Sequence, residues 1–447
     1  KASRKFMCVQ FVAKLSLCLI LNKPILFKHT KHPPITYFCL MKYVVVIGGG
    51  AAGFFAAISC AEANPELNVL LLEKGKDVLG KVLISGGGRC NVTHACFDPK
   101  ELATYYPRGA KELLGPFHKF QPGDTMEWFA DRGVELKIEA DNRVFPVTDS
   151  SSTIADCLIE MAEAAGVQVR TSSGVKAFTQ AEDGTWQILT ISGESLVADK
   201  LMVAPGSSKG IWDQLKKAGH KIVPPVPSLF TFNIKDSRIK GLSGISLPHA
   251  TVQVASSDLE ASGPLLITHW GLSGPAVLRL SAWGARELND RFYRFPILVN
   301  WIGRDEEVVV SEFLREKKES GKKRIGNHTH YEVPLRLWKS MVAAAGIPNT
   351  ATWGDISSKQ IKALAGELCS AVYQVTGKST FKEEFVTAGG VDLKDVNFKT
   401  FSSRVVPNLF FAGEILNIDG ITGGFNFQAA WTGGFLAGNA MAGYPLD

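Results

Sequence analysis

The sequence predicts an α/β protein in which a discontinuous Rossmann-type domain is interrupted by an inserted domain that is β-rich and partly helical. Three observations predict this fold class. An apolar strand runs into a glycine-rich turn and a helix just after Met41, a similar strand, turn and helix occur near the C-terminus, and the pattern between them is different. The 447 residues are enough for two or three domains with sizeable cores.

The first 40 residues differ in composition from the rest and are left out of the predicted fold. They contain seven Lys or Arg and no Asp or Glu, so the net charge of +6 leaves −1 for residues 41–447. We interpret this leader as sequence upstream of a start at Met41, with an organelle transit peptide as the alternative. Its apolar stretch is short and is interrupted by Lys14 and Lys23, which argues against a membrane span.

Composition also bounds the partners and the compartment. Residues 41–447 have no basic excess of the kind that favours nucleic acid, so we expect neither a nucleic-acid nor a membrane partner. The five cysteines outside the leader form no CxxC pair and no Cys/His metal spacing, which predicts reduced thiols, no metal site and a cytoplasmic protein. These cysteines are Cys60, Cys90, Cys96, Cys157 and Cys369.

The first unit has the order strand, glycine turn, helix, strand and acidic residue. Residues 43–47 are a continuous β-branched run, typical of a parallel strand buried on both faces. They lead into the glycines of 48–53, an Ala-rich helix over 54–63, and a second apolar strand over 67–72 that ends at Glu73. This order is that of a dinucleotide-binding unit.

The glycines and the acid of this unit have separate physical roles. Gly48 permits the tight turn, Gly50 lets a pyrophosphate approach the backbone, and Gly53 lets the helix pack closely on the strand. The helix N-terminus offers free N–H groups and a positive dipole end to phosphates, and Glu73 is placed to bind ribose hydroxyls. The expected contacts are Gly48, Gly50, Ala51, Ala52, Gly53, Glu73 and Lys74. This unit alone does not distinguish FAD from NAD.

A second glycine cluster follows over residues 80–91. Three consecutive glycines disfavour both helix and strand, so we expect a loop laid against the ligand, with Lys81 and Arg89 offsetting phosphate charge. Cys90 has no resolving cysteine nearby, so a packing role beside the cofactor is favoured and a catalytic thiol is the alternative. The expected contacts are Lys81, Ser85, Gly86, Gly87, Gly88, Arg89, Cys90 and Asn91.

The C-terminal end of the chain repeats the arrangement of the first unit. An apolar strand over 408–412 leads through Gly413 and Glu414 into a glycine turn and a helix over 427–442. The dipole of this helix would stabilise negative charge on a reduced flavin, and Glu414 is placed to bind ribityl hydroxyls. The expected contacts are Gly413, Glu414, Asp419, Gly423, Gly424, Phe425 and Asn426.

The first part of the Rossmann-type domain is expected to continue to residue 223. Residues 149–165 have apolar positions at helical spacing and predict a helix, whereas 167–178 alternate as a strand. Runs over 186–191 and 196–203 predict a meander that ends in a turn beside the cofactor. The expected contacts in that turn are Ala204, Pro205 and Gly206.

The insertion is predicted over 224–378, and the domain is predicted to resume over 379–447. Three prolines over 224–227 indicate a linker. Strands are expected over 229–234, 250–255 and 263–268, and a helical, charged stretch is expected to open at 298–301 and to include 308–317 and 335–345.

The insertion also contains the one candidate catalytic residue, His269. It lies in the sequence Thr-His-Trp-Gly-Leu-Ser-Gly-Pro, a shaped loop that could place its side chain near the flavin as a proton shuttle, and a structural histidine in a turn is the alternative. Basic residues over 315–324 are interleaved with Glu316 and Glu319, so a solvated helix end is favoured over a nucleic-acid surface.

Four segments carry a family resemblance: IGGGAAG (47–53), LISGGGRCNVT (83–93), VTAGGV (386–391) and FAGEILNIDGITGGFNFQAAWTGG (411–434). Through them, residues 41–447 resemble the bacterial NAD(P)/FAD-dependent oxidoreductase family that includes aminoacetone oxidase. The resemblance implies tightly bound FAD, a glutathione-reductase-type FAD fold with an inserted domain, and contact between the backbone of Val175 and the adenine. The sequence departs from the family pattern at Asn417, where Asp is common, and in the short turn over 204–208 and the segment 400–404.

The expected function is an FAD-dependent oxidoreductase. It would move a hydride between a small organic substrate (an amine, or an unsaturated or keto compound) and flavin N5. Reoxidation by O2 or by NAD(P) stays open, and because no second strand–GxGxxG–helix unit is present, NADH or NADPH is expected to visit the flavin transiently. The alternative is a flavin-binding scaffold or an RNA-modification-associated factor without small-molecule turnover. A monomer or homodimer is expected.

Overall fold

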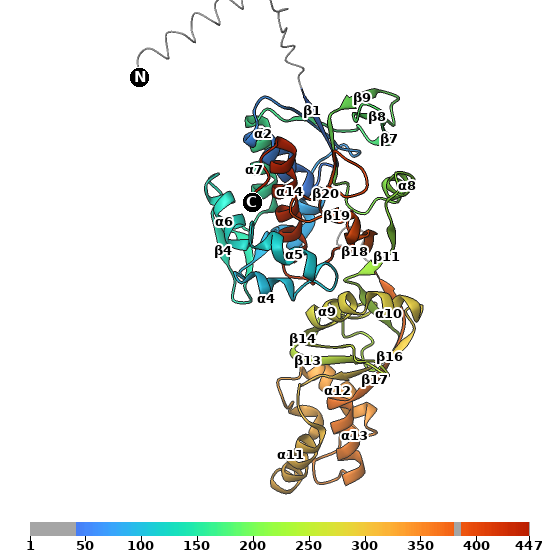
Figure 1. Cartoon of the computed structure of the whole chain (residues 1–447). Helices are drawn as coiled ribbons and strands as arrows, with labels where there is room; N and C mark the ends of the chain where they lie inside the picture. The colour runs from blue at the N-terminus through green and yellow to red at the C-terminus, as the bar shows by residue number, and fades with distance from the viewer. Residues whose placement is uncertain (1–41, 380–385, 447) are drawn as a thin grey trace, which may run out of the picture. The chain divides into compact units, whose positions relative to one another are not determined.

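The computed structural model describes residues 42–379 and 386–446 (Figure 1). The leader over 1–40 lies outside the described residues. Two large hydrophobic clusters are present in the described part: one combines residues from both ends of the chain, and the other contains buried residues from Phe230 to Val375. The fold is the predicted α/β class with a Rossmann-type domain and an insertion. The limits 224 and 378 stay a prediction.

The main sheet has seven strands in the order β19-β20-β21-β10-β1-β2-β6. β1 (Tyr43–Ile47) lies between β2 (Asn68–Leu72) and β10 (Lys200–Val203), and β21 (Leu409–Phe411) pairs with β10, all in parallel. The C-terminal strand therefore joins the same sheet as the N-terminal strand, which is what a discontinuous domain requires. The remaining strands are β6 (Gln168–Arg170), β19 (Val396–Asn397) and β20 (Ser402–Ser403).

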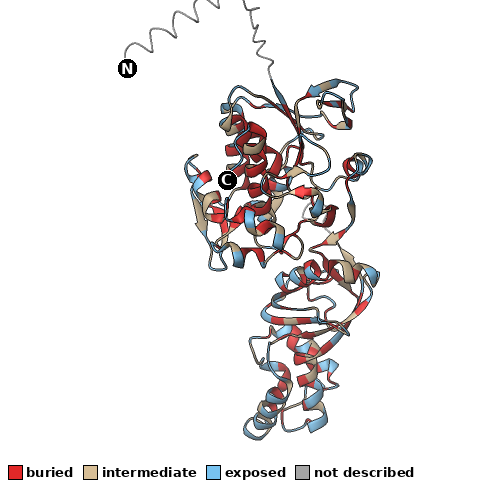
Figure 2. Cartoon of the chain, in the orientation of Figure 1, coloured by how far each residue is buried: buried red, intermediate tan, exposed pale blue. Residues whose placement is uncertain are grey.

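Two helices from opposite ends of the chain, α2 (Ala51–Ala63) and α14 (Phe425–Ala442), pack against each other beside this sheet (Figure 1). A Cβ atom at Gly434 would lie 2.8 Å from the carbonyl oxygen of Ala52, so the approach requires glycine. Both helices are apolar around most of their circumference, which is typical of helices that are covered on all sides. Figure 2 shows both of them mostly buried.

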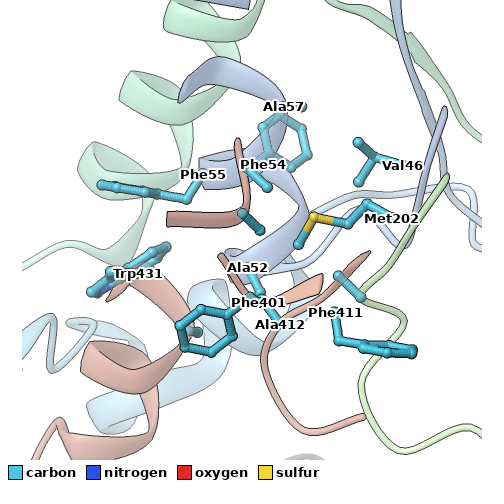
Figure 3. Close-up of a cluster of buried hydrophobic side chains, with 14 of the residues drawn as sticks. Val46, Ala52, Phe54, Phe55, Ala57, Met202, Phe401, Phe411, Ala412 and Trp431 are labelled. Atoms are coloured by element: carbon cyan, nitrogen blue, oxygen red, sulfur yellow. The ribbon is translucent and has the colours of Figure 1, made fainter. Parts of the chain in front are cut away.

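The core between these helices and the sheet holds the two ends of the chain together (Figure 3). The ring of Phe55 lies 5.3 Å from that of Trp431, so a residue of the first helix contacts a residue of the last. Each large apolar side chain buried in this way contributes roughly 1.5–3 kcal/mol. The labelled members of the core are Val46, Ala52, Phe54, Phe55, Ala57, Met202, Phe401, Phe411, Ala412 and Trp431.

The residue pattern predicted most helices and strands of the Rossmann-type domain, but it merged two strands into one. The predicted helix over 149–165 is α7 (Ser151–Ala164). The stretch 167–178, predicted as one strand, is two strands in different sheets, β6 and β7 (Val175–Gln180), because the chain turns at Ser172, whose φ is 51°. β7 continues into a meander with β8 (Trp186–Thr190) and β9 (Ser195–Ala198).

The three prolines that indicated a linker lie in a strand that the sequence did not predict. β11 (Ile222–Ser228) pairs antiparallel with β18 (Val386–Val391). The register of this pair shifts between Val223 and Val226, where Pro224 and Pro225 lie. A two-stranded ribbon with such an irregularity tolerates residues that lack an N–H donor.

The insertion is built on a closed barrel of six strands in the order β12-β15-β14-β13-β16-β17. The strand over 295–300 was expected to open a helical stretch, and it pairs instead with the barrel strands on either side of it. The barrel strands are β12 (Thr231–Ile234), β13 (Ser246–Val254), β14 (Glu260–Ile267), β15 (Gly271–Ser273), β16 (Phe295–Asn300) and β17 (Ala371–Ser379).

The helical part of the insertion follows β16, and two of its helices were predicted: α11 (Glu306–Glu319) and α12 (Leu335–Ala344). A third, α13 (Ser358–Cys369), was not predicted. Two shorter helices, α9 (Pro275–Trp283) and α10 (Ala285–Asp290), lie next to the barrel and contact β11. Among the described residues, no helix has the length and apolarity needed to cross a membrane.

The Rossmann-type domain also contains several shorter helices and strands. They are α3 (Gly80–Gly88), α4 (Pro99–Ala103), α5 (Ala110–Phe117), α6 (Pro122–Ala130), α8 (Lys209–Lys217), β3 (Thr93–His94), β4 (Leu136–Ile138) and β5 (Arg143–Pro146).

Candidate cofactor site

The turn between β1 and α2, which we call the front turn (48–53), is fixed by backbone contacts. The N–H of Gly48 donates to the carbonyl of Leu72 at 2.8 Å, and a Cβ atom at Gly48 would overlap the backbone of Ala204. A Cβ atom at Gly53 would overlap the carbonyl oxygen of Gly48. Gly50 differs, because a Cβ atom there would meet nothing within 4 Å. The backbone at Gly50 is therefore open to a ligand at the uncapped start of α2.

Glu73 holds its carboxylate at the end of β2, next to the front turn. One oxygen accepts from the N–H of Gly49 at 2.7 Å, and the other accepts from the N–H of Gly75 at 2.6 Å. The carbonyl of Glu73 also accepts from the N–H of Ser173 at 2.7 Å, which brings the start of β7, with Val175, beside it. The side chain of Lys74 is exposed.

The second glycine cluster is only partly the loop that the sequence predicts. Residues 80–84 are helical, and the chain leaves helical geometry at Ser85, Gly86 (φ 59°) and Gly87 (φ 70°). The prediction of a loop over the whole of 80–91 is therefore wrong for its first five residues, where the glycines do not yet interrupt the helix. Cβ atoms at Gly87 and Gly88 would meet nothing within 4 Å, so this backbone is open too.

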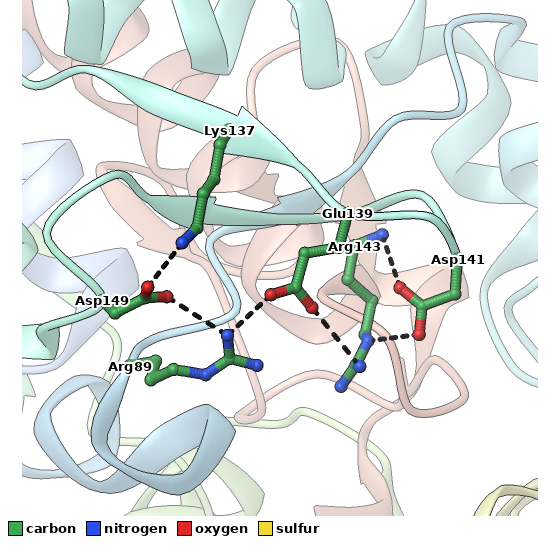
Figure 4. A network of polar contacts seen from close by, with 6 residues as sticks. All are labelled: Arg89, Lys137, Glu139, Asp141, Arg143 and Asp149. Carbon is green, nitrogen blue, oxygen red and sulfur yellow. Dashed lines mark hydrogen bonds and ion pairs between the residues drawn. The ribbon is translucent and has the colours of Figure 1, made fainter.

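Cys90 and Arg89 anchor the end of this cluster. Cys90 is buried with a φ of 59°, and burial raises the pKa of its thiol to about 12, which favours the packing role over a catalytic thiol. The guanidinium of Arg89 lies 2.6 Å from Glu139 and 3.1 Å from Asp149, and Lys137 contacts the same aspartate (Figure 4). Two carboxylates already balance the charge of Arg89, so its part in offsetting phosphate charge stays a prediction.

The C-terminal segment reaches the same place as the front turn and the second cluster. The Lys81 ammonium forms an ion pair with Glu414. A Cβ atom at Gly413 would lie 3.1 Å from the Cβ of Ala52, and one at Gly206 would lie 3.7 Å from a carboxylate oxygen of Glu414. The structure therefore brings together four segments that are far apart in the sequence, and each contains predicted contact residues.

The rear turn (419–424), which leads into α14, is held by amide side chains. Asn426 donates to the carbonyl of Gly420 at 3.0 Å and accepts from its N–H at 2.9 Å. With its amide oriented to satisfy both groups, Asn91 donates to the carbonyl of Thr93 and accepts from the N–H of Gly424, each at 3.0 Å. The start of α14 has no acidic residue in its first turn and no side-chain cap at Gly424, so its N-terminal dipole is available to an anion.

An aromatic cluster that the sequence did not reveal packs on the start of α14. The ring centroid of Phe425 lies 4.6 Å from that of His94 and 4.5 Å from that of Tyr105. The hydroxyl of Tyr106 donates to the carbonyl of Phe425 at 2.6 Å. Nδ1 of His94 is buried without a hydrogen-bond partner among the described residues, and burial lowers the pKa of this histidine.

Asp419 is a predicted contact residue whose charged side chain is fully buried. It is 0% exposed and forms an ion pair with Arg108, and the hydroxyl of Ser228 donates to it at 2.8 Å. Burial raises the pKa of Asp419, and the hydrogen bond from Arg108 opposes that change. Arg108 and Ser228 were not predicted, because nothing local in the sequence marks either of them as a partner of a residue so far along the chain.

His269 is not brought to this site by any contact among the described residues. It is exposed on the turn between β14 and β15. That turn is tied to the far end of β12, because the N–H of Ile234 donates to the carbonyl of Trp270 at 2.9 Å. The catalytic role of His269 therefore stays a prediction.

The parallel sheet, the two glycine turns at helix N-termini and the insertion define a Rossmann-type FAD-dependent oxidoreductase. The chain belongs to the HI0933-like family: its residues 42–440 match the family described as "HI0933-like protein Rossmann domain".

Relatives in this family have different named activities. The chain is 29% identical over 406 residues to a ribosomal RNA dihydrouridine synthase of Escherichia coli K12, covering 87% of this chain and 95% of that protein. It is 26% identical over 429 residues to a 3-dehydro-bile acid delta(4,6)-reductase of Clostridium scindens, covering 91% and 100%. Among solved structures, a 3-ketosteroid-delta4-(5alpha)-dehydrogenase from Rhodococcus jostii RHA1 matches with a TM-score of 0.49 and 14% identity, covering 91% of this chain and 99% of that chain.

Proposed function

We propose that this oxidoreductase transfers a hydride between a small organic substrate and N5 of FAD, and that it acts as a reductase of a carbon–carbon double bond conjugated to a carbonyl. The observations that carry the cofactor part are two helix N-termini without side-chain caps, those of α2 and α14, and glycine backbone at Gly50, Gly87 and Gly88 that is open to a ligand. An elongated anionic dinucleotide with a redox ring at one end suits such a site.

The residues at the site fit FAD in composition as well as position. Glu73 would bind ribose hydroxyls, the front turn would bind the pyrophosphate, and Glu414 beside Lys81 would face the ribityl chain. The side-chain oxygen of Asn417 is buried without a partner among the described residues, as expected of a group that awaits a hydrogen-bond donor. FAD, when bound, supplies hydride chemistry that no amino-acid side chain provides.

The chain's own residues would then exclude water and stabilise charge. The start of α14 presents its positive dipole end, which stabilises negative charge on the reduced ring. The aromatic cluster of His94, Tyr105 and Phe425 covers that end with apolar surface. Burial raises the pKa of Tyr105 further above its ordinary value, so its hydroxyl is protonated at neutral pH.

The direction of the reaction is supported by the names of the relatives. A delta(4,6)-reductase and a dihydrouridine synthase both saturate a double bond conjugated to a carbonyl group. In the balanced reaction, NADH or NADPH loses a hydride, the double bond gains that hydride and one proton, and oxidised nicotinamide leaves. In the oxidation of an amine by O2, the substrate would instead give its hydride to the flavin, so the substrate step would run in the opposite direction.

The test is anaerobic bleaching of the flavin spectrum of the purified full-length protein. The proposal predicts bleaching by NADH or NADPH and recovery when 2-cyclohexen-1-one or a steroid 4-en-3-one is added without air. Bleaching by aminoacetone, with recovery only in air, would show an amine oxidase and contradict the reductase. Failure of every donor to bleach the flavin would contradict the oxidoreductase chemistry.

A second candidate is reduction of a uracil base within RNA. It is favoured by the ribosomal RNA dihydrouridine synthases of E. coli and Haemophilus influenzae, at 29% and 28% identity, and by the charge of the insertion. Residues 231–379 contain 19 Lys or Arg and 14 Asp or Glu, whereas in the rest of 41–447 the acidic residues outnumber the basic ones. A salt-dependent mobility shift of an rRNA fragment, with NADPH-dependent gain of two hydrogens by mass, would support it over the small-molecule reductase.

A further inference from the structure

The rear turn is tied to the insertion through Asp419. This residue lies six positions before the start of the long helix α14, and its carboxylate has no exposed surface. A carboxylate without water must be paired to remain charged. The partners of Asp419 come from three other segments of the chain, and two of these segments belong to the insertion or lead into it.

Arg108 is the central partner. Its guanidinium donates to both carboxylate oxygens of Asp419 through Nε and Nη2, the planar fork that arginine forms with a carboxylate. Nη2 also donates to the carbonyl of Ala282, in the last turn of α9, at 2.7 Å. A single side chain of the Rossmann-type domain therefore holds the rear turn and a helix of the insertion.

Two further residues tie the insertion to the same carboxylate. The hydroxyl of Ser228, the last residue of β11, donates to Asp419 at 2.8 Å. Arg286 on α10 donates to the carbonyl of Pro224 in β11 at 2.9 Å, and its charge acts on both Arg108 and Asp419. Chain entry into the insertion, the helices α9 and α10, and the rear turn thus meet at one buried charge.

The loop that carries Arg108 also contacts the start of α14. Tyr105 packs on the ring of Phe425, and Tyr106 donates its hydroxyl to the carbonyl of that residue. A change in the rear turn would therefore be felt by this loop and, through Arg108, by α9. Buried, bidentate pairs of this kind transmit position because they have one geometry and lose much when it is broken.

We propose that Arg108 is a positioning residue: by bridging Asp419 and the carbonyl of Ala282, it sets α9 of the insertion against the rear turn, and so orients a substrate held between the insertion and the flavin. The proposal rests on the proposed function. Because coupling between two sites is reciprocal, FAD bound at the rear turn should stiffen α9, and α9 should in turn affect how FAD is held.

The direct test compares hydrogen–deuterium exchange of the full-length protein with and without FAD, in wild type, Arg108→Met and a matched control. The control is Arg238→Met, because Arg238 is 17% exposed in its side chain against 14% for Arg108, and it forms ion pairs with Asp236 and Glu367 away from the rear turn. The proposal predicts that FAD slows exchange in 275–283 in wild type and in the control, and that Arg108→Met loses this effect. Equal slowing in all three proteins, or none in wild type that has bound FAD, would overturn it.

Turnover provides a second readout. With NADPH, 2-cyclohexen-1-one and saturating FAD, kcat/KM of Arg108→Met should fall by about 100-fold, as for a small misplacement of substrate. Arg108→Lys should recover part of the loss, because it keeps the charge but not the fork. If Arg108→Met does not fold, Ser228→Ala is the test variant, because it removes only one hydrogen bond to Asp419. In Ser228→Ala, FAD should slow hydrogen–deuterium exchange in 275–283 less than it does in wild type. Equal slowing in both proteins would overturn the proposal. A wild type that binds no FAD would instead contradict the proposed function.

Discussion

The front and rear turns have the same local design, a strand that runs through glycines into a helix N-terminus, but they are held in different ways. The front turn is held by backbone: Gly48 and Gly53 sit where any side chain would overlap a carbonyl group. The rear turn is held by side chains from distant segments: Arg108, Asn91 and Ser228, with Asn426 from its own helix.

This difference teaches that one half of the site is fixed mainly by close backbone packing and the other by side chains that reach it from distant segments. Backbone atoms that are already in close contact cannot make room for an added side chain, so a substitution in the front turn should be severe. Its effect should not depend on the insertion. A side-chain network loses its members one at a time, so changes in the rear turn should be graded and should depend on burial.

The largest effect is expected at the front turn. Gly53→Ala puts a Cβ atom onto the carbonyl oxygen of Gly48, so the protein should lose more than about 3 kcal/mol of stability and all FAD binding. Urea unfolding and FAD content measure this. The control is Gly210→Ala in α8, where a Cβ atom meets nothing within 4 Å and alanine favours the helix. A Gly53→Ala protein with normal FAD content would refute the backbone account.

The next effect is expected from the buried ion pair of the rear turn. Asp419→Ala leaves the Arg108 guanidinium without its partner and should cost about 3–5 kcal/mol of unfolding free energy. The double variant Arg108→Met/Asp419→Leu should recover much of that loss, because no charge is left unpaired. Asp141→Ala serves as the control, since Asp141 is 57% exposed and its pair with Arg143 is worth about 0–1 kcal/mol. Equal costs for both single variants would contradict a special role for burial.

A moderate effect is expected at Asn426. Replacement by alanine removes both hydrogen bonds to Gly420 and should cost about 1–3 kcal/mol in the free energy of FAD binding or of unfolding. Asn426→Asp keeps the acceptor and loses the donor, so its cost should be intermediate. Calorimetric FAD titration separates the two free energies. No loss in either would mean that Asn426 does not hold the rear turn.

A smaller effect is expected from pH, again at the rear turn. Burial lowers the pKa of His94, which faces Asp141 and Glu101, below the value of about 6.5 expected in the unfolded chain. The folded protein then binds fewer protons than the unfolded chain, so stability is present above about pH 6.5 and is lost as the pH falls. Urea unfolding at several pH values should show a shallower dependence in His94→Phe and no change in His249→Phe, where the histidine is exposed. Identical profiles would contradict the assignment to His94.

The smallest effect is expected where the second cluster meets the tail. The Lys81 side chain is 51% exposed, so Lys81→Ala should change the unfolding free energy by only about 0–1 kcal/mol despite the ion pair with Glu414. FAD affinity should fall more at low than at high salt if Lys81 also faces phosphate. A salt-independent loss would place Lys81 in a packing role only.

What the sequence could predict follows the same division. Strands β1 and β2 and helix α2 were predictable because burial on both faces and glycine chemistry are written in consecutive residues. β11 was not, since prolines usually mark a loop and only pairing with β18 makes a strand of them. Of the site, the glycines of both turns were found, whereas Arg108, Tyr105 and His94 were missed, because their roles arise from contacts between residues far apart in the chain.

The measurement that tests the central claim most directly is a titration of the flavin-free full-length protein with FAD, followed by the flavin's visible absorbance and circular dichroism. If the front and rear turns close on one dinucleotide, wild type takes up one equivalent with an induced dichroic signal, Gly53→Ala takes up none, and Asn426→Ala binds more weakly with an altered signal from the ring. A wild-type protein that stays colourless, or rear-turn variants that leave both affinity and spectrum unchanged, would contradict the account.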